Sequence, residues 1–155
     1  MSGKIEARLK ELGIELPQPS APVANYVPFA VSGNLVFIAG QISQWNGERR
    51  FVGKLGAAIS IADGQQAARL SALNIIAHLL VAAGGDLDRA RRCLRLGGFV
   101  NCTPDFTDMP QVVNGASDLM VEVFGDAGRH ARAAVGTTSL PGGVAVEVEA
   151  TFELG

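Results

Sequence analysis

Two charged residues near the C-terminus, Arg132 and Glu147, have sequence neighbours that suit a binding or catalytic site. Arg132 precedes the small residues Ala133-Ala134-Val135-Gly136, which leave room beside the guanidinium. A guanidinium can bind a carboxylate through two charge-assisted hydrogen bonds in one plane. Glu147 alternates with apolar residues, so we expect it on the polar face of a strand. A surface ion pair for Arg132 and a solvated face for Glu147 are the plainer interpretations, and these residues alone leave both open.

Other candidate chemistries lack the neighbours that they need. His78 and His130 have no metal-ligand spacing and no supporting cysteines, so we expect no metal site. Neither Cys93 nor Cys102 has a histidine nearby in sequence to activate a thiol. The segment 53–56 has only part of a phosphate-loop pattern and is interpreted as a turn.

Charge and cysteine usage narrow the class of protein. Thirteen Lys and Arg against fifteen Asp and Glu give a net charge of −2, whereas nucleic-acid binders usually carry a basic face. We therefore expect no nucleic-acid partner. The two cysteines would lie about 30 Å apart along one strand, beyond disulfide reach. Free thiols are typical of a reducing cytoplasm, where we place the protein.

Composition indicates association between copies of the chain. Of the 155 residues 48% are hydrophobic and only 18% charged, where a soluble domain usually carries about a quarter. We expect part of this apolar surface to be buried against other subunits. Apolar stretches such as residues 79–83 are far shorter than the roughly 20 residues of a membrane-spanning helix, so we expect no membrane insertion.

Helix and strand signals alternate along the chain. The expected elements are a short helix over 3–12, strands over 26–31, 35–39 and near 50–52, a helix over 61–83, a strand over 94–102, a helix from Asp108, and strands over 131–139 and 144–152. Ser60 and Asp108 are candidate N-caps. Leu140-Pro141-Gly142-Gly143 joins the last two strands, which predicts a terminal hairpin.

This order predicts an α+β fold in a single domain over residues 1–155, with residues 1–21 forming an N-terminal helix and a proline-rich connector. Two long helices would cover one face of a mixed sheet. No helix remains for the other face, so we expect the sheet of another subunit to cover it.

The segment from Arg132 to Ala150 has a characteristic order. It contains Arg132-Ala-Ala-Val-Gly-Thr-Thr-Ser-Leu-Pro141, followed by Val146-Glu147-Val148-Glu149-Ala150. Tyr26 stands fourteen residues before Gly40-Gln41, and Asn114 lies on the second long helix. In these features the chain resembles the YjgF/RidA family of reactive intermediate deaminases, from about Pro22 to Phe152.

The resemblance implies a chorismate-mutase-like fold and a homotrimer with clefts between subunits. It implies hydrolysis of reactive enamines and imines, the 2-imino acids, to a 2-keto acid and ammonia without a cofactor. Arg132 matches the family's carboxylate-binding arginine, and Glu147 matches the acidic residue that handles the water and its proton. Other matched positions line the cleft: Tyr26, Gly40, Asn114, Ala134 and Pro141.

Several positions depart from the family pattern. Ala39 stands where a small hydroxyl residue is frequent, and Ala134 stands where cysteine is frequent. The N-terminal helix and the long segment 41–56, with Trp45, are additional. The chain therefore resembles a divergent branch. His130 shares a strand face with Arg132, and we expect it to face solvent.

Spacing in the expected hairpin argues for a shared site. A turn centred between Pro141 and Gly142 would pair Arg132 with Thr151, about 13 Å from Glu147. One small substrate could not touch both side chains of one subunit. We expect a cleft that combines Arg132 of one chain with Glu147 of its neighbour.

Two functions remain from this sequence. The first is an enamine/imine deaminase. The second is a non-catalytic trimer that binds a small carboxylate in the same cleft. Glu147 favours catalysis, because a site that only binds an anion gains nothing from an acid beside it.

Overall fold

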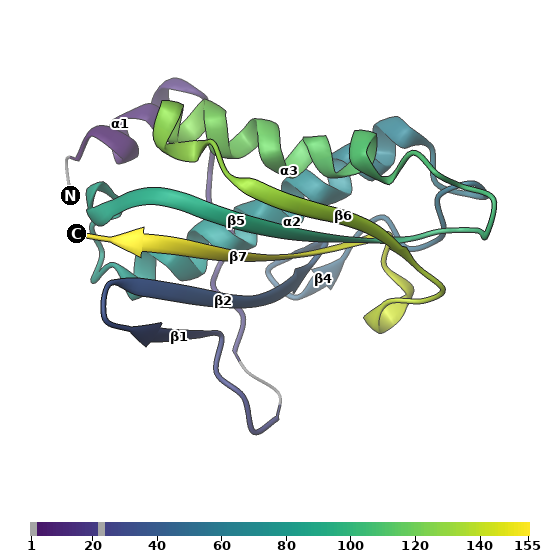
Figure 1. Cartoon of the computed structure of the whole chain (residues 1–155), viewed down its shortest axis with the longest axis horizontal. Coiled ribbons are helices and arrows are strands. Elements are labelled where there is room, and N and C mark those ends of the chain that lie inside the picture. Colours follow the sequence, from purple (N-terminus) through teal and green to yellow (C-terminus); the bar gives the residue numbers. More distant parts are fainter. Residues whose placement is uncertain (1–2, 22–23) are drawn as a thin grey trace.

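The computed structural model describes residues 3–21 and 24–155 and has an α+β fold with a mixed sheet (Figure 1). The helices are α1 Lys4–Glu11, α2 Ile61–Ala82 and α3 Met109–Phe124, with short 3-10 turns η1 Leu87–Arg89, η2 Gly125–Gly128 and η3 Pro141–Gly143. The strands are β1 Phe29–Ser32, β2 Leu35–Ile42, β3 Gln44–Trp45, β4 Glu48–Arg49, β5 Ala90–Asn101, β6 Ala131–Thr137 and β7 Val146–Leu154. The predicted fold class and the short N-terminal helix are confirmed.

The main sheet has the strand order β1-β2-β7-β5-β6. The predicted terminal hairpin is wrong. β6 pairs in parallel with β5, and β7 pairs antiparallel with β2 and β5, so β5 lies between the two strands expected to pair. The connection around η3 is therefore a crossover. The glycines between β6 and β7 suggest a tight turn, because the sequence does not show that β5 takes the position between the two strands.

Helices α2 and α3 cover one face of this sheet, as predicted (Figure 1). The residues of β7 that face them are buried, and they alternate with half-buried residues on the other face. Gly98 in β5 explains one close approach, because a Cβ there would lie 2.6 Å from both methyl carbons of Val113 in α3. A glycine that weakens a strand by itself thus lets the helix pack directly on the sheet.

The predicted boundaries of α2 hold to within a residue. Ser60 Oγ accepts a hydrogen bond from the Asp63 N–H at 3.1 Å, as an N-cap does. The polar residues Ser71, Asn74 and His78 are all buried. Ser71 Oγ donates to the carbonyl of Val146, and Asn74 donates to that of Gln44. These contacts join α2 to β7 and β3.

Helix α1 packs at the far end of α3. The N–H groups of Lys4 and Ile5 donate to the Asp88 carboxylate at 3.0 and 2.9 Å. These hydrogen bonds, led by that of Ile5, hold the pKa of Asp88 below its usual range. The Asp88 carboxylate from η1 therefore caps the N-terminus of α1. Because Asp88 is far from α1 in sequence, the residues next to the helix do not indicate this cap.

The sheet face away from the helices carries both apolar and charged side chains. Phe37 is 47% exposed and Val135 is 45% exposed. Between them Arg95 and Glu149 form an ion pair at 3.1 Å. Among the described residues, no helix is both long enough and apolar enough to cross a membrane.

Candidate active site

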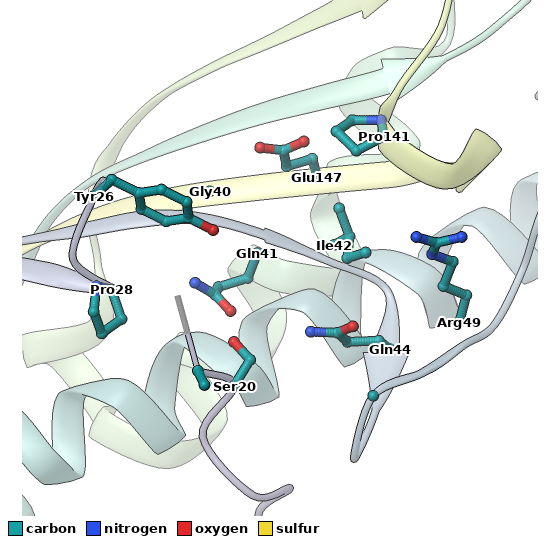
Figure 2. A pocket seen from close by; sticks show the side chains of 12 residues that line it. Ser20, Tyr26, Pro28, Gly40, Gln41, Ile42, Gln44, Arg49, Pro141 and Glu147 are labelled. Carbon is teal, nitrogen blue, oxygen red and sulfur yellow. The ribbon is translucent and has the colours of Figure 1, made fainter. Parts of the chain in front are cut away.

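A cavity of about 510 Å³ opens at the end of β2, beyond the stretch that β1 covers (Figure 2). The last hydrogen bond on that side runs from Ala39 N–H to Pro28 O, just before β1, so among the described residues no strand pairs with the end of β2 there. Four residues expected at the site line this cavity: Tyr26, Gly40, Pro141 and Glu147. Segments far apart in the sequence therefore meet at this cavity.

The Glu147 side chain lies over the backbone of Gly40 on the neighbouring strand. A Cβ on Gly40 would lie 3.0 Å from Glu147 Cδ and still closer to Oε2. The position falls in a β-bulge, because Ile38 pairs with Ala150 whereas Gln41 pairs with Val148. Bulges re-aim side chains beside active sites. Glycine at position 40 thus makes the space that the carboxylate occupies.

Burial raises the pKa of the Glu147 carboxyl, and the negative charge of Glu149 raises it further. Glu149 lies two residues along the same strand face and pairs with Arg95. A carboxyl with a raised pKa holds its proton at a higher pH than an ordinary one does. That property suits a group that takes a proton and then returns it near neutral pH.

Arg132 is held by helix α3. Its Nη1 donates to Asn114 Oδ1 at 2.8 Å and to Ser117 Oγ at 3.0 Å, and its Nη2 donates to the carbonyl of Pro110 at 3.2 Å. A guanidinium has five N–H donors. Within the described chain, Nε–H and one N–H of Nη2 remain without a partner. These neighbouring donors can bind both oxygens of one carboxylate.

His130 is half-buried rather than solvent-facing. Its Nδ1 lies 2.6 Å from the carbonyl of Gly128, which can only accept, so Nδ1 carries the proton. In a neutral imidazole with this tautomer, Nε2 accepts from Ser117 Oγ at 2.8 Å. The same Ser117 oxygen accepts from Arg132. A chain of hydrogen bonds thus runs from His130 through Ser117 to the guanidinium.

Arg132 and Glu147 lie on opposite faces of the sheet. Arg132 pairs in register with the buried Leu96 and bonds to α3, whereas Glu147 alternates with residues that face the helices. Through β5, Arg132 is aligned with Leu96 and Glu147 with Phe99, which separates them by two strands and three residues, or roughly 14 Å. Within one subunit they do not reach the same cavity.

The residues expected at one cleft thus form two groups. Tyr26, Gly40, Pro141 and Glu147 line the cavity, while Asn114 contacts Arg132 at the sheet edge. Ala134 lies on β6 with Arg132, partly packed against the core, and does not line the cavity. The separation expected from the hairpin is found, but through the crossover and not through a tight turn.

Sequence reasoning missed Arg49, which also lines the cavity. It lies in the hairpin of β3 and β4, which turns at Asn46 and Gly47, both with positive φ, in place of the single strand expected near 50–52. Asn-Gly between two short strands is the strongest short hairpin signal, and it would have placed Arg49 opposite Gln44. Ser117 was also missed, since only the fold brings it to Arg132.

Other reactive groups do not line this cavity. Cys93 and Cys102 are buried free thiols, and burial raises the pKa of Cys93 to about 12. His78 is buried behind Ser20, whose Oγ lies 3.2 Å from its Nε2, and burial lowers its pKa. Among the described residues, no group of three His, Cys, Asp or Glu side chains is arranged to hold a metal.

A family model described as "YjgF/chorismate mutase-like, putative endoribonuclease" matches residues 6–148. The chain belongs to the YjgF/RidA family. The chain is similar to Protein TCP17 of Trypanosoma cruzi, which is 47% identical over 154 residues, 99% of this chain and 96% of that protein.

Two solved structures of YjgF/RidA relatives match nearly the whole chain. The protein Atu1372 of Agrobacterium tumefaciens, described as having unknown function, is 46% identical with a TM-score of 0.90, over 97% of this chain and 93% of its own. A putative endoribonuclease of Shewanella oneidensis is 36% identical with a TM-score of 0.94, over 98% and 100%. Such coverage takes in most of the N-terminal extension, so these two proteins share it.

Proposed function

We propose that this family member hydrolyses reactive enamines and imines, converting 2-imino acids to 2-keto acids and ammonia in the cytoplasm. The active unit is a homotrimer in which each cleft joins Arg132 of one subunit to the Glu147 cavity of the next. Two features support the shared cleft. The two groups lie on opposite faces of one sheet, and the face away from the helices exposes Phe37 and Val135.

Arg132 binds the carboxylate of the substrate in this proposal. Asn114, Ser117 and Pro110 use three of its donors and fix the guanidinium plane. The two donors left form the fork that a carboxylate fits. A lysine would supply the charge without this orientation.

Glu147 handles the water and its proton. The water oxygen bonds to the imine carbon, and Glu147 accepts the proton that the water loses. Glu147 passes this proton to the nitrogen, which gives a carbinolamine. The hydroxyl proton of the carbinolamine then moves through Glu147 to the same nitrogen, the carbon–nitrogen bond breaks, and the nitrogen leaves as ammonia while the carbonyl forms. The sum is one imine and one water giving one keto acid and one ammonia. Imines hydrolyse unaided, so the acceleration demanded of one acid–base group is modest.

The observation that carries catalysis over simple binding is the state of Glu147. Its carboxyl is half-buried, its pKa is raised and Gly40 makes space for it. A site that only binds a carboxylate needs Arg132 alone, and an acid near the bound anion would repel it when ionised. The alternative is a non-catalytic carboxylate binder, and the experiment must distinguish it from the deaminase.

The test generates imino acids in situ with an amino-acid oxidase and follows the imine with semicarbazide. We expect the wild type to remove the imine faster than buffer does, and Arg132→Ala and Glu147→Gln to lose most of this acceleration. Arg129→Ala is the matched control, because Arg129 is a nearby exposed arginine whose ion-pair partner is Asp126. It should keep full activity.

Three results would count against the proposal. No acceleration by the wild type, with carboxylate binding lost in Arg132→Ala, would support the binder. A monomer in light scattering would contradict the shared cleft. Cleavage of RNA by the same preparations, lost with Glu147→Gln while imines are untouched, would favour the activity in the family model's description.

A further inference from the structure

A second arginine enters the cavity from the β3–β4 hairpin. Arg49 pairs in register with Gln44, so both side chains project from the same face of the hairpin, and both line the cavity with Glu147 (Figure 2). The connector of residues 12–21 supports this hairpin, because the N–H of Gln18 donates to Asn46 Oδ1 at 2.7 Å. The arginine is therefore carried by a built element and not by a loose loop.

The Arg49 side chain packs on the crossover beside Pro141. A Cβ on Gly142 would lie 2.7 Å from Arg49 Cζ, so the guanidinium lies against bare backbone, at a residue whose φ of 66° also favours glycine. No hydrogen bond or ion pair of the Arg49 side chain is found among the described residues. The next arginine, Arg50, differs: it pairs with Glu48 at 3.4 Å and lies 5.9 Å from the ring centroid of Trp45.

The cavity is larger than the smallest imino acids require. Its volume of about 510 Å³ falls in the range of sites that take drug-sized ligands. Arg49 is the one cationic side chain among the described residues that line it, and Figure 2 shows Arg49 and Tyr26 at opposite ends. An unpaired guanidinium at one end of a roomy cavity can bind an anionic group at the far end of a substrate.

We infer that Arg49 selects substrates with a second anionic group, namely 2-imino acids whose side chain ends in a carboxylate. This inference rests on the proposed function and names its substrate class. The neighbour's Arg132 binds the carboxylate beside the imine, and Arg49 binds the one on the side chain. Two separate guanidinium groups then fix both ends of the substrate and leave the imine carbon at Glu147.

The test compares two imines, one made by oxidation of glutamate and one by oxidation of leucine. Arg49→Met replaces the guanidinium with a side chain of similar reach, Arg49→Lys keeps the charge, and Arg50→Met is the matched control on the outer side of the hairpin. We expect Arg49→Met to lower kcat/KM for the glutamate-derived imine by about 10- to 100-fold, the effect of lost hydrogen bonds to a charged group. The leucine-derived imine should be unaffected, and Arg50→Met should behave as wild type on both. Arg49→Lys should fall in between.

Equal loss on both imines would overturn the inference, because Arg49 would then serve the carboxylate that all imino acids share. No loss on either would overturn it as well. In both cases the deaminase proposal would stand.

Calorimetric titration tests the role of Arg49 independently of the deaminase activity. If no imine is hydrolysed, binding of 2-oxoglutarate is compared with binding of 2-oxobutyrate in the wild type and Arg49→Met. Tighter binding of the dicarboxylate that depends on Arg49 supports the inference without the proposed reaction. Equal binding of the two keto acids overturns the inference as well as the proposed reaction.

Discussion

The carboxyl group of Glu147 occupies the space where any residue other than glycine at position 40 would place its Cβ. A signature on β7 and a glycine on β2, more than a hundred residues apart in sequence, are thus one structural feature. Gly40→Ala should displace the carboxylate and lower kcat by roughly 100-fold, as misplacing a catalytic group by about 1 Å can. Imine hydrolysis by Gly40→Ala, measured in both the wild-type and the Glu147→Gln enzyme, checks this. If Gly40→Ala slows the Glu147→Gln enzyme by a further large factor, the effect does not pass through Glu147.

Arg132 and Glu147 on opposite sheet faces predict complementation between inactive subunits. Arg132→Ala and Glu147→Gln chains, each inactive alone, should regain activity when unfolded together and refolded. Random mixing in a trimer gives roughly a quarter of the clefts both intact groups. Imine hydrolysis by the mixture, against each variant refolded alone, measures it. A mixture that stays inactive while forming trimers would mean that each subunit supplies its own pair.

Ser117 links His130 to Arg132, so its hydroxyl should matter for substrate binding. Ser117→Ala leaves one N–H of Nη1 and the His130 Nε2 without a partner. KM should rise about tenfold with kcat little changed, since the chemistry at Glu147 is untouched. Ser117→Thr keeps the hydroxyl and should restore KM. A fall in thermal stability with no change in KM would assign Ser117 a purely structural role.

The charge on Glu149 should set part of the pH dependence. Burial first, and Glu149 second, raise the pKa of Glu147. Glu149→Gln removes the repulsion and frees Arg95, and both changes favour the ionised form of Glu147. Because the base must be ionised, activity is lost as pH falls through this pKa, so the acid limb of the kcat/KM profile should move to lower pH. Glu153→Gln makes the same change six residues, or about 20 Å, from Glu147 along the strand, and it should leave the limb in place. An acid limb that stays put or rises in Glu149→Gln would contradict the assignment of that limb to Glu147.

The sequence by itself determined the α+β class, the two long helices and the family. The family resemblance implied Gly40 and Pro141 as positions lining the cleft, and alternation in β7 placed Glu147 opposite the buried face. These are local properties, because side-chain direction within a strand and capping at Ser60 depend on nearby residues.

The tertiary structure decided which strands pair and which side chains meet. Placing β5 between β6 and β7 depends on packing over the whole sheet, so the terminal segment that suggested a hairpin became a crossover. The same packing places Arg132 against α3, where Ser117 links it to His130. It also places Arg49 beside Gly142. Contacts between residues far apart in sequence arise only when the chain closes around its core, and the spacing of residues in the sequence does not encode them.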